Sequence, residues 1–203
     1  MKIICIGRNY AEHAKEMNSP VPSEPVFFLK PDTALIKDNQ PFYYPDFSKE
    51  IHHEVEIVLK INKPGKNIST GFANKYYDEI GIGIDFTARD IQAICKEKGL
   101  PWEKGKAFDG SAPVGQFVNK NKFSDINNIN FHLTINGNTV QKGSTKDLLF
   151  SFDKVISYIS TFITLKTGDL IFTGTPEGVG PVVIGDRLEA YIENEKLINF
   201  EIK

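Results

Sequence analysis

The sequence lacks the features that mark secreted, membrane-spanning and nucleic-acid-binding proteins. Among 203 residues there are two cysteines, Cys5 and Cys95, which form no C-x-x-C pair, so free thiols in a reducing compartment are expected. No apolar run approaches the roughly 20 residues that span a bilayer, and residues 1–7 are too short for a signal peptide. A net charge of −2 gives no reason to expect nucleic acid or a membrane as partner. We therefore expect a cytoplasmic protein.

Arginine is scarce as well, while the overall composition is ordinary. Of 24 basic residues only Arg8, Arg89 and Arg187 are arginine, and lysine cannot reproduce the bidentate guanidinium fork. With 40% hydrophobic and 25% charged residues, the chain has enough material for a core. It contains no internal repeat, low-complexity tract or linker, so residues 1–203 are expected to form a single domain.

The hydrophobic pattern predicts a β-dominated α+β domain with a few peripheral helices. The order of elements gives no regular βαβ units, which counts against a Rossmann or TIM-barrel layout. Thr87 is the predicted N-cap of a helix that would bring its N-terminal amides near Asp85. Helices are predicted over 9–17, 88–98 and 151–165, and strands over 1–7, 26–29, 51–61, 77–86, 131–135, 139–141, 170–173, 187–192 and 197–202.

Three carboxylates indicate a metal site. In a strand over 51–61, Glu54 and Glu56 would share one face, roughly 7 Å apart, and would repel each other unless a cation neutralises them. Asp85 ends a strand whose same face carries Gly81 and Gly83, and such glycines often mark the close approach of a ligand or backbone. Without a matching His or Cys cluster, this set favours Mg²⁺, Mn²⁺ or Ca²⁺ over zinc. The alternatives are an exposed polar strand face and a structural Asp85.

A histidine and a glutamate near the N-terminus form a candidate general base. His13 and Glu16 are three residues apart in a predicted helix, so their side chains can meet, and a carboxylate that orients imidazole raises its basicity. The alternative is a solvent-exposed pair on a surface helix. A proline-containing loop over 19–25 follows, so residues 9–25 are a candidate mobile lid.

Two lysines and a glycine-rich turn are candidates for holding an anion. Lys30 follows the apolar run 26–29, and Lys106 lies in a stretch that we expect to be flexible and basic. The turn over 173–180 is not a P-loop, because the Gly-Lys-Ser/Thr ending is missing. Its amides and hydroxyls could hold a carboxylate, although a tight turn between strands is the plainer interpretation.

Taken in order along the chain, these motifs resemble the fumarylacetoacetate hydrolase family. The resemblance extends over nearly the whole chain and is closest to the short acylpyruvase-type members, also known as oxaloacetate decarboxylases or tautomerases. The motifs that carry it are Gly7-Arg8-Asn9-Tyr10, His13 with Glu16, Phe28-Leu29-Lys30-Pro31, His53-Glu54-Val55-Glu56, Asp85-Phe86-Thr87-Ala88-Arg89-Asp90 and Thr173-Gly174-Thr175-Pro176.

The resemblance implies a mixed β-sandwich roll, a homodimer and a set of site residues. Glu54, Glu56 and Asp85 would hold Mg²⁺ or Mn²⁺, with Ca²⁺ an option in a crystal. One departure is Asp109, an extra acid after Lys106 that we expect near the pocket, where it would affect substrate preference. The implied catalytic residues are His13, Glu16 and Lys106, and the implied substrate-binding residues are Arg8, Lys30, Arg89, Gln92 and Thr175.

The implied activity is metal-dependent cleavage of a carbon–carbon bond in a small 1,3-dioxo or 2-oxo acid. Acylpyruvate hydrolysis and oxaloacetate decarboxylation are the leading reactions. An alternative is an isomerase, decarboxylase or keto–enol tautomerase acting on 2-oxo dienedioates from aromatic breakdown. A third interpretation, from another class, is a non-catalytic, metal-stabilised binding protein.

Overall fold

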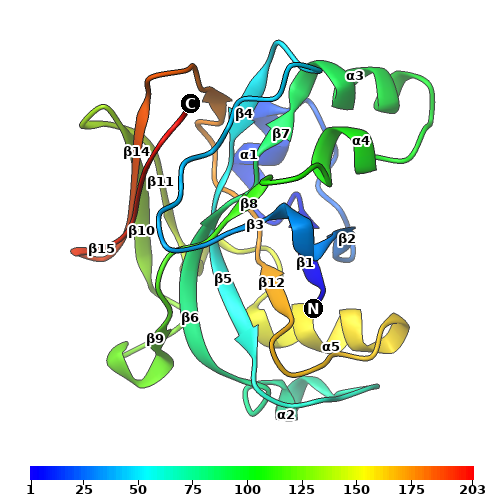
Figure 1. Ribbon diagram of the computed structural model, residues 1–203. Helices are drawn as coiled ribbons and strands as arrows, with labels where there is room; N and C mark the ends of the chain where they lie inside the picture. The colour runs from blue at the N-terminus through cyan, green and yellow to red at the C-terminus, as the bar shows by residue number, and fades with distance from the viewer.

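A six-stranded mixed sheet runs through the middle of the protein in a computed structural model that describes all residues, 1–203 (Figure 1). Its strand order is β2-β1-β12-β5-β6-β9; β1 and β12 are parallel and the other neighbours antiparallel. The strands are β1 Ile3–Gly7, β2 Val26–Lys30, β5 Val55–Ile61, β6 Tyr77–Ile84, β9 Val118–Asn119 and β12 Leu170–Phe172.

A four-stranded antiparallel sheet packs against one face of the central sheet, at the left of Figure 1. Its order is β11-β10-β14-β15, and the larger buried cluster of apolar side chains draws residues from both sheets. Asn136 and Gly137 form the turn between β10 and β11, and both have positive φ, as a tight two-residue hairpin turn requires. The strands are β10 Asn130–Ile135, β11 Asn138–Ser144, β14 Arg187–Ile192 and β15 Glu195–Glu201.

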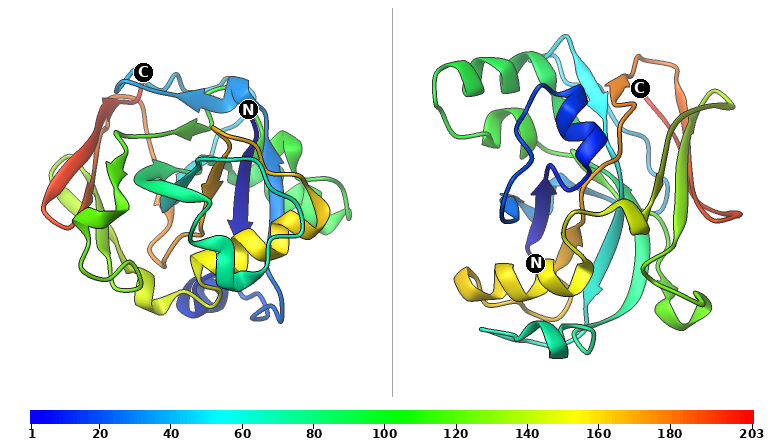
Figure 2. Two further views of the ribbon diagram at one scale, coloured as in Figure 1. Left: turned by 90° about the horizontal axis from the view of Figure 1, so that it is seen from below. Right: turned by 180° about the vertical axis from the view of Figure 1, so that it is seen from behind.

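The helices are short and lie around the sheets (Figures 1 and 2). α3 and α4 lie near one end of the central sheet, and α2 and α5 lie at the other. None has the length and apolar character needed to cross a membrane. The β-dominated α+β prediction is confirmed. The helices are α1 Ala11–Glu16, α2 Thr70–Ala73, α3 Arg89–Glu97, α4 Glu103–Lys106 and α5 Phe152–Phe162, with 3₁₀ turns η1 Asp32–Ala34, η2 Lys120–Lys122 and η3 Thr145–Asp147.

The predicted strand over 51–61 is wrong in one respect, because it breaks at Glu54. The residues before the break form β4 (Ile51–His53), which belongs to a small sheet with β7 (Thr87–Ala88) and β13 (Gly180–Pro181). β5 begins directly afterwards, in the central sheet. A further pair, β3 (Leu35–Ile36) with β8 (Ala112–Pro113), is parallel. The chain therefore changes sheets at Glu54, a step that strand periodicity does not encode.

The predicted start of the second helix is also wrong. Ala88, not Thr87, is the N-cap of α3, and no side chain caps this helix. Thr87 pairs with His52 in the small sheet, and its hydroxyl donates to the carbonyl of Asp85. Since α3 begins only at Arg89, its first amides do not directly follow Asp85 as predicted.

The strand glycines leave room for aromatic rings instead of a ligand. A Cβ at Gly81 would lie 2.9 Å from the ring of Phe117, and one at Gly83 would lie 2.5 Å from Phe172 Cε1. These rings come from segments distant in sequence, so the expectation that the glycines clear the strand for a ligand is wrong. The space is part of the packed interior.

Gly83→Ala should therefore destabilise the protein by about 1–3 kcal/mol, because the added methyl overpacks this region. The matched control is Gly71→Ala, where a Cβ meets nothing within 4 Å and φ is not positive. Since alanine favours helix over glycine by up to about 1 kcal/mol, the control should be neutral or stabilising. Urea unfolding of both variants measures the difference, and equal midpoints would contradict the packing argument.

Candidate active site

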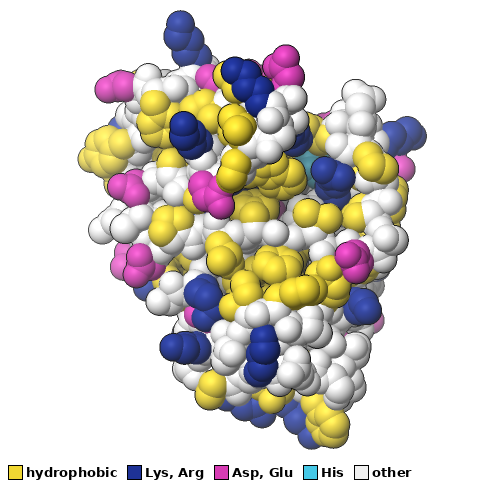
Figure 3. Space-filling view, turned by 90° about the vertical axis from the view of Figure 1, so that its right-hand side faces the viewer, with side chains coloured by type: hydrophobic (Ala, Val, Ile, Leu, Met, Phe, Trp, Pro, Cys, Tyr) yellow, Lys and Arg dark blue, Asp and Glu magenta, His cyan; other side chains and the backbone are white.

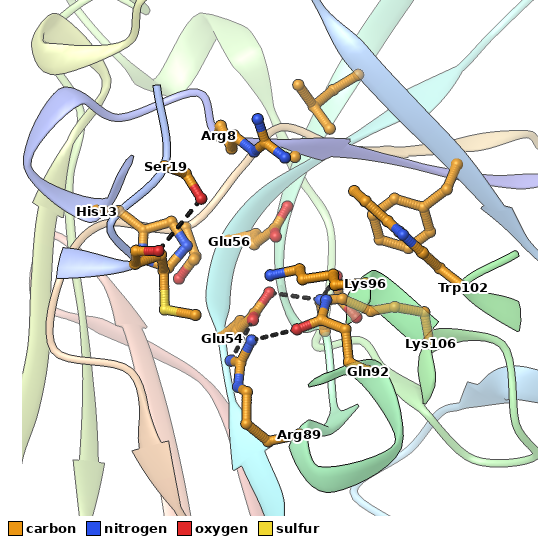
Figure 4. Close-up of a pocket in the computed structure, with 16 residues that line it drawn as sticks. Arg8, His13, Ser19, Glu54, Glu56, Arg89, Gln92, Lys96, Trp102 and Lys106 are labelled. Atoms are coloured by element: carbon orange, nitrogen blue, oxygen red, sulfur yellow. Dashed lines mark hydrogen bonds and ion pairs between the residues drawn. The ribbon is translucent and has the colours of Figure 1, made fainter. Parts of the chain in front are cut away.

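The three predicted carboxylates meet where β5 begins and β6 ends. Register pairs Glu56 with Gly83 and Val55 with Ile84, and the amide of Asp85 donates to the carbonyl of Glu54 over 2.8 Å. All three carboxyl groups are buried, and one oxygen from each lies within 4.8 Å of the others. They form the floor of a cavity, and Figure 4 shows Glu54, directly before β5, and Glu56, within β5, in that cavity.

Three buried or half-buried cations surround this floor. Lys106 Nζ lies 2.7 Å from Glu54 and 2.9 Å from Asp85, and an Arg89 nitrogen lies 2.6 Å from the other Glu54 oxygen. Lys30 Nζ lies 2.7 Å from Asp85. Burial alone would raise the pKa of Glu54, but Lys106 and Arg89 outweigh it and hold that pKa below its usual range.

The sequence suggested that Lys106 lies in a flexible stretch, and this expectation is wrong. It is the last residue of α4 and is only 3% exposed. Burial lowers the pKa of Lys106, but Asp85 and Glu54 outweigh burial and raise it overall. The ammonium group is therefore held charged between two of the three carboxylates.

Lys30 contacts Asp85 from outside the cavity. It does not line the cavity, and its ammonium donates to the carbonyls of Phe86 and Ser111 and to the Ser111 hydroxyl while contacting Asp85. These contacts favour a role in orienting Asp85. Direct binding of substrate by Lys30 stays a prediction.

Glu56 is the carboxylate that lacks a cation. Its one hydrogen bond is accepted from the amide of Gly174, over 2.6 Å, and it forms no ion pair. Burial raises the pKa of Glu56 well above its usual value, and Asp85 and Glu54 raise it further. A hard divalent cation prefers such oxygen ligands, so this set fits Mg²⁺, Mn²⁺ or Ca²⁺.

His13 and Glu16 lie at the edge of the cavity on α1. His13 Nδ1 lies 3.1 Å from one Glu16 oxygen, and the other oxygen accepts from the amide of Gly178. Because a carboxylate accepts from Nδ1–H, the ring leaves Nε2 as the basic nitrogen. His13 is buried and lines the cavity, so the solvent-exposed alternative is wrong for it.

The turn after β12 is hydrogen-bonded to Asn9, in the segment that follows β1. The Asn9 side chain donates to the carbonyls of Thr173 and Phe150, and the amide of Phe150 donates back to it. Gly174 has φ +104°, and a Cβ there would lie 2.6 Å from Asn9 Cβ. This close approach presents the Gly174 amide to Glu56.

Gln141 is a buried residue that sequence reasoning did not identify. Its carbonyl oxygen accepts from the amide of Val55 and lies 2.8 Å from Nδ1 of His53, while its amide donates to the hydroxyl oxygen of Thr175. Because the hydroxyl oxygen of Thr175 already accepts the hydrogen bond from Gln141, its proton is free to be donated into the cavity. Thr175 lines that cavity.

Most predicted residues line this one cavity, but Asp109 does not. Asp109 is exposed and borders a separate depression with Tyr43 and Phe47, so the expected effect of Asp109 on the pocket is wrong.

Arg89 donates to Gln92 as well as to Glu54. Lys96 was missed, although it lies four residues after Gln92, on the same helix face. The cavity is lined by Ile6, Gly7, Arg8, His13, Met17, Ser19, Phe28, Glu54, Glu56, Asp85, Arg89, Gln92, Lys96, Trp102, Lys106 and Thr175.

Comparison with known proteins agrees with the motifs. The family model described as fumarylacetoacetate (FAA) hydrolase C-terminal matches residues 2–202. The mouse protein named oxaloacetate tautomerase FAHD1, mitochondrial, is 45% identical over 99% of this chain and 91% of its own length. The Dictyostelium discoideum protein named oxaloacetate decarboxylase, mitochondrial, is 43% identical over 94% and 88%.

A solved structure shares the whole fold. Fumarylpyruvate hydrolase from Pseudomonas aeruginosa, in complex with Mn²⁺ and pyruvate, superimposes with a TM-score of 0.94 at 36% identity, covering 100% of this chain and 89% of that one. The fold implied by the sequence motifs is confirmed.

The unpaired state of Glu56 gives a pH-dependent prediction for protein in EDTA. A carboxyl group whose pKa is raised by folding stabilises the folded state at low pH. This contribution is lost as the pH rises through the pKa of the group in the folded protein. Glu56→Gln, which resembles the protonated acid, should therefore melt above wild type at pH 8, and this advantage should vanish toward pH 4. Differential scanning calorimetry measures both; an advantage that persists at low pH would contradict the argument.

Mn²⁺ should reverse the order of stability of wild type and Glu56→Gln at pH 8. At one hundred times its dissociation constant, it should add about 2.7 kcal/mol to the unfolding free energy of wild type. Glu56→Gln should gain much less, because one anionic ligand is gone. An equal gain in both proteins would remove Glu56 from the ligand set.

Proposed function

Since the chain belongs to the fumarylacetoacetate hydrolase family, we propose that it is a divalent-metal-dependent enzyme that cleaves a carbon–carbon bond in small 1,3-dioxo or 2-oxo acids. Acylpyruvate hydrolysis and oxaloacetate decarboxylation are the leading reactions. The observation that carries the proposal is the buried set Glu54, Glu56 and Asp85 with His13 at the rim of the same cavity. The names of the relatives support enzymatic activity over the non-catalytic interpretation.

Glu54, Glu56 and Asp85 would hold the ion, with Mg²⁺ or Mn²⁺ proposed and Ca²⁺ an option in a crystal. When bound, it would supply Lewis-acid stabilisation of negative charge on the substrate oxygens. Lys106, proposed as catalytic, would donate a hydrogen bond to a substrate oxygen from its buried ammonium group. Arg8, Lys30, Arg89, Gln92 and Thr175 remain proposed as substrate-binding residues.

His13 is the proposed general base, and Glu16 orients it. In hydrolysis, His13 Nε2 would take a proton from water while the resulting hydroxide adds to the distal carbonyl. The carbon–carbon bond then breaks, its electron pair leaves with the pyruvate part as an enolate, and a proton returns to carbon. Decarboxylation of oxaloacetate gives the same enolate without a nucleophilic water.

Tautomerisation is the second candidate reaction. It needs a base that moves a proton between carbon and oxygen, which the same histidine can do, and a relative at 45% identity is named an oxaloacetate tautomerase. The corresponding reaction on 2-oxo dienedioates is the wider alternative of this class. All these reactions pass through an enolate.

We also propose that residues 1–203 form one catalytic domain in which residues 9–25 open as a lid. The Glu16–Gly178 hydrogen bond is one contact that would break on opening, whereas Asn9, bonded to Phe150 and Thr173, would stay in place at the base of the lid. Cys5 and Cys95 are buried and unpaired, which fits a reducing compartment. The cytoplasmic location stays a prediction, because the mouse and Dictyostelium discoideum relatives are named as mitochondrial.

A homodimer is proposed through the β2 patch, defined as Phe27, Leu29, Leu100 and Phe162. β2 is an edge strand of the central sheet, and Leu29, Leu100 and Phe162 are 41%, 49% and 59% exposed. Figure 3 shows apolar side chains gathered on this side of the molecule. An edge strand that pairs antiparallel with its own copy gives a self-complementary interface about a two-fold axis.

Leu29→Lys should shift the protein to the mass of one chain, because it places a charge in this interface. Light scattering after size exclusion measures the mass. The control Ile184→Lys alters an exposed apolar residue outside the patch and should leave a dimer. A monomeric wild type would contradict the proposal.

His13→Ala should lower kcat for acetylpyruvate hydrolysis by about 10²–10⁴-fold and lower oxaloacetate decarboxylation much less. The matched control is His132→Ala, on the four-stranded sheet and outside the cavity. Absorbance of the enol and enzymatic assay of pyruvate give the two rates. Hydrolysis that survives His13→Ala intact would show that the base is assigned wrongly.

A further inference from the structure

Two cations in the cavity, Arg8 and Lys96, have no carboxylate partner. Neither forms an ion pair within 4.0 Å or a side-chain hydrogen bond, whereas Lys106 and Arg89 in the same cavity are both engaged by Glu54. Lys30, Lys106 and Arg89 already balance the charge of the three carboxylates of the floor, so Arg8 and Lys96 are not needed to neutralise them. The positive charge of Arg8 and Lys96 is therefore available to a ligand.

The backbone fixes where these two side chains begin. Arg8 follows β1 with φ +60°, a left-handed conformation that is costly for a residue other than glycine and tends to be kept at functional sites. Asn9, its neighbour, is anchored by three hydrogen bonds to Phe150 and Thr173. Lys96 lies on α3, one turn after Gln92. Figure 4 shows Arg8 and Lys96 entering the cavity from different elements.

Lys96 is in a surplus of positive charge. Lys96 is exposed at the mouth of the cavity, and partial desolvation lowers its pKa. Arg89, Lys106 and Arg8 lower that pKa further, against an opposing effect of Glu54. Each of these cations would be stabilised by an anion placed among them. Phe28 and Trp102, whose ring centroids lie 6.0 Å apart, also line the cavity and offer an apolar wall to the carbon chain between two charged ends.

We propose that Arg8 and Lys96 form a subsite for the distal carboxylate of a dicarboxylic 2-oxo acid. This inference rests on the proposed function, in which the 2-oxo acid end is held at the carboxylate floor. The far end of a short substrate then reaches the two unpaired cations. A substrate with a neutral alkyl end would leave them without a partner, so the subsite selects dicarboxylates over neutral acylpyruvates.

Two unreactive ligands of equal length test the subsite by titration calorimetry on the Mn²⁺-loaded protein. 2-Oxoglutarate carries a carboxylate where 2-oxopentanoate carries a methyl group, and wild type should prefer the former. Lys96→Met should weaken 2-oxoglutarate about tenfold, the loss of roughly one charge-assisted hydrogen bond, and leave 2-oxopentanoate unchanged. Lys96→Arg should restore most of the preference. Lys98→Met, the same change near the same end of α3 but outside the cavity, should have no effect.

The outcomes separate this inference from the function on which it rests. Equal affinity of wild type for both ligands, or equal weakening of both by Lys96→Met, would overturn the subsite and leave the 2-oxo acid function in place. Binding of neither ligand by Mn²⁺-loaded wild type would overturn the proposed function and the subsite together.

Discussion

Three carboxylates buried within 4.8 Å of one another repel strongly, and much of the surrounding structure compensates for that repulsion. Lys106 and Arg89 hold Glu54, and Lys106 and Lys30 hold Asp85. Removing one partner from a buried ion pair typically costs about 3–5 kcal/mol, so each of these cations is required where it lies. Glu56 alone is left to a backbone amide, and this incomplete compensation is why we propose that the cluster binds a cation.

The compensation explains why segments far apart in sequence converge at one end of the sheet. β2 brings Lys30, α3 brings Arg89 and α4 brings Lys106, while Asn9 holds the turn whose Gly174 amide reaches Glu56. Buried polar groups of this kind contribute little net stability compared with apolar packing. They fix a geometry instead. The cavity has a carboxylate floor, which we propose takes a metal ion, and two further cations, Arg8 and Lys96, which we propose take the far end of a dicarboxylate bound at that ion.

The chemistry and spacing of the residues made much of the site predictable. The tertiary contacts that bring these residues together could not be predicted. Glu54, Glu56, Asp85 and His13 were found because carboxylate and imidazole spacing is visible in a strand or helix. The strand break at Glu54 depends on which strands pair with β4 and β5, and no local pattern states that. The burial of Lys106 and the rings that fill the space beside Gly83 depend equally on distant segments. Lys96 could have been found from its helical spacing to Gln92.

We propose that a metal held by the buried carboxylates enables enolate chemistry on a 2-oxo acid. The most direct measurement follows the ultraviolet absorbance of acetylpyruvate and of oxaloacetate with purified protein, in Mg²⁺ and in excess EDTA. We expect the enol band of at least one substrate to decay at an enzyme-dependent rate in Mg²⁺ and at the uncatalysed rate in EDTA. Decay at the same enzyme-dependent rate in EDTA, or no catalysis of either substrate in Mg²⁺, would contradict it.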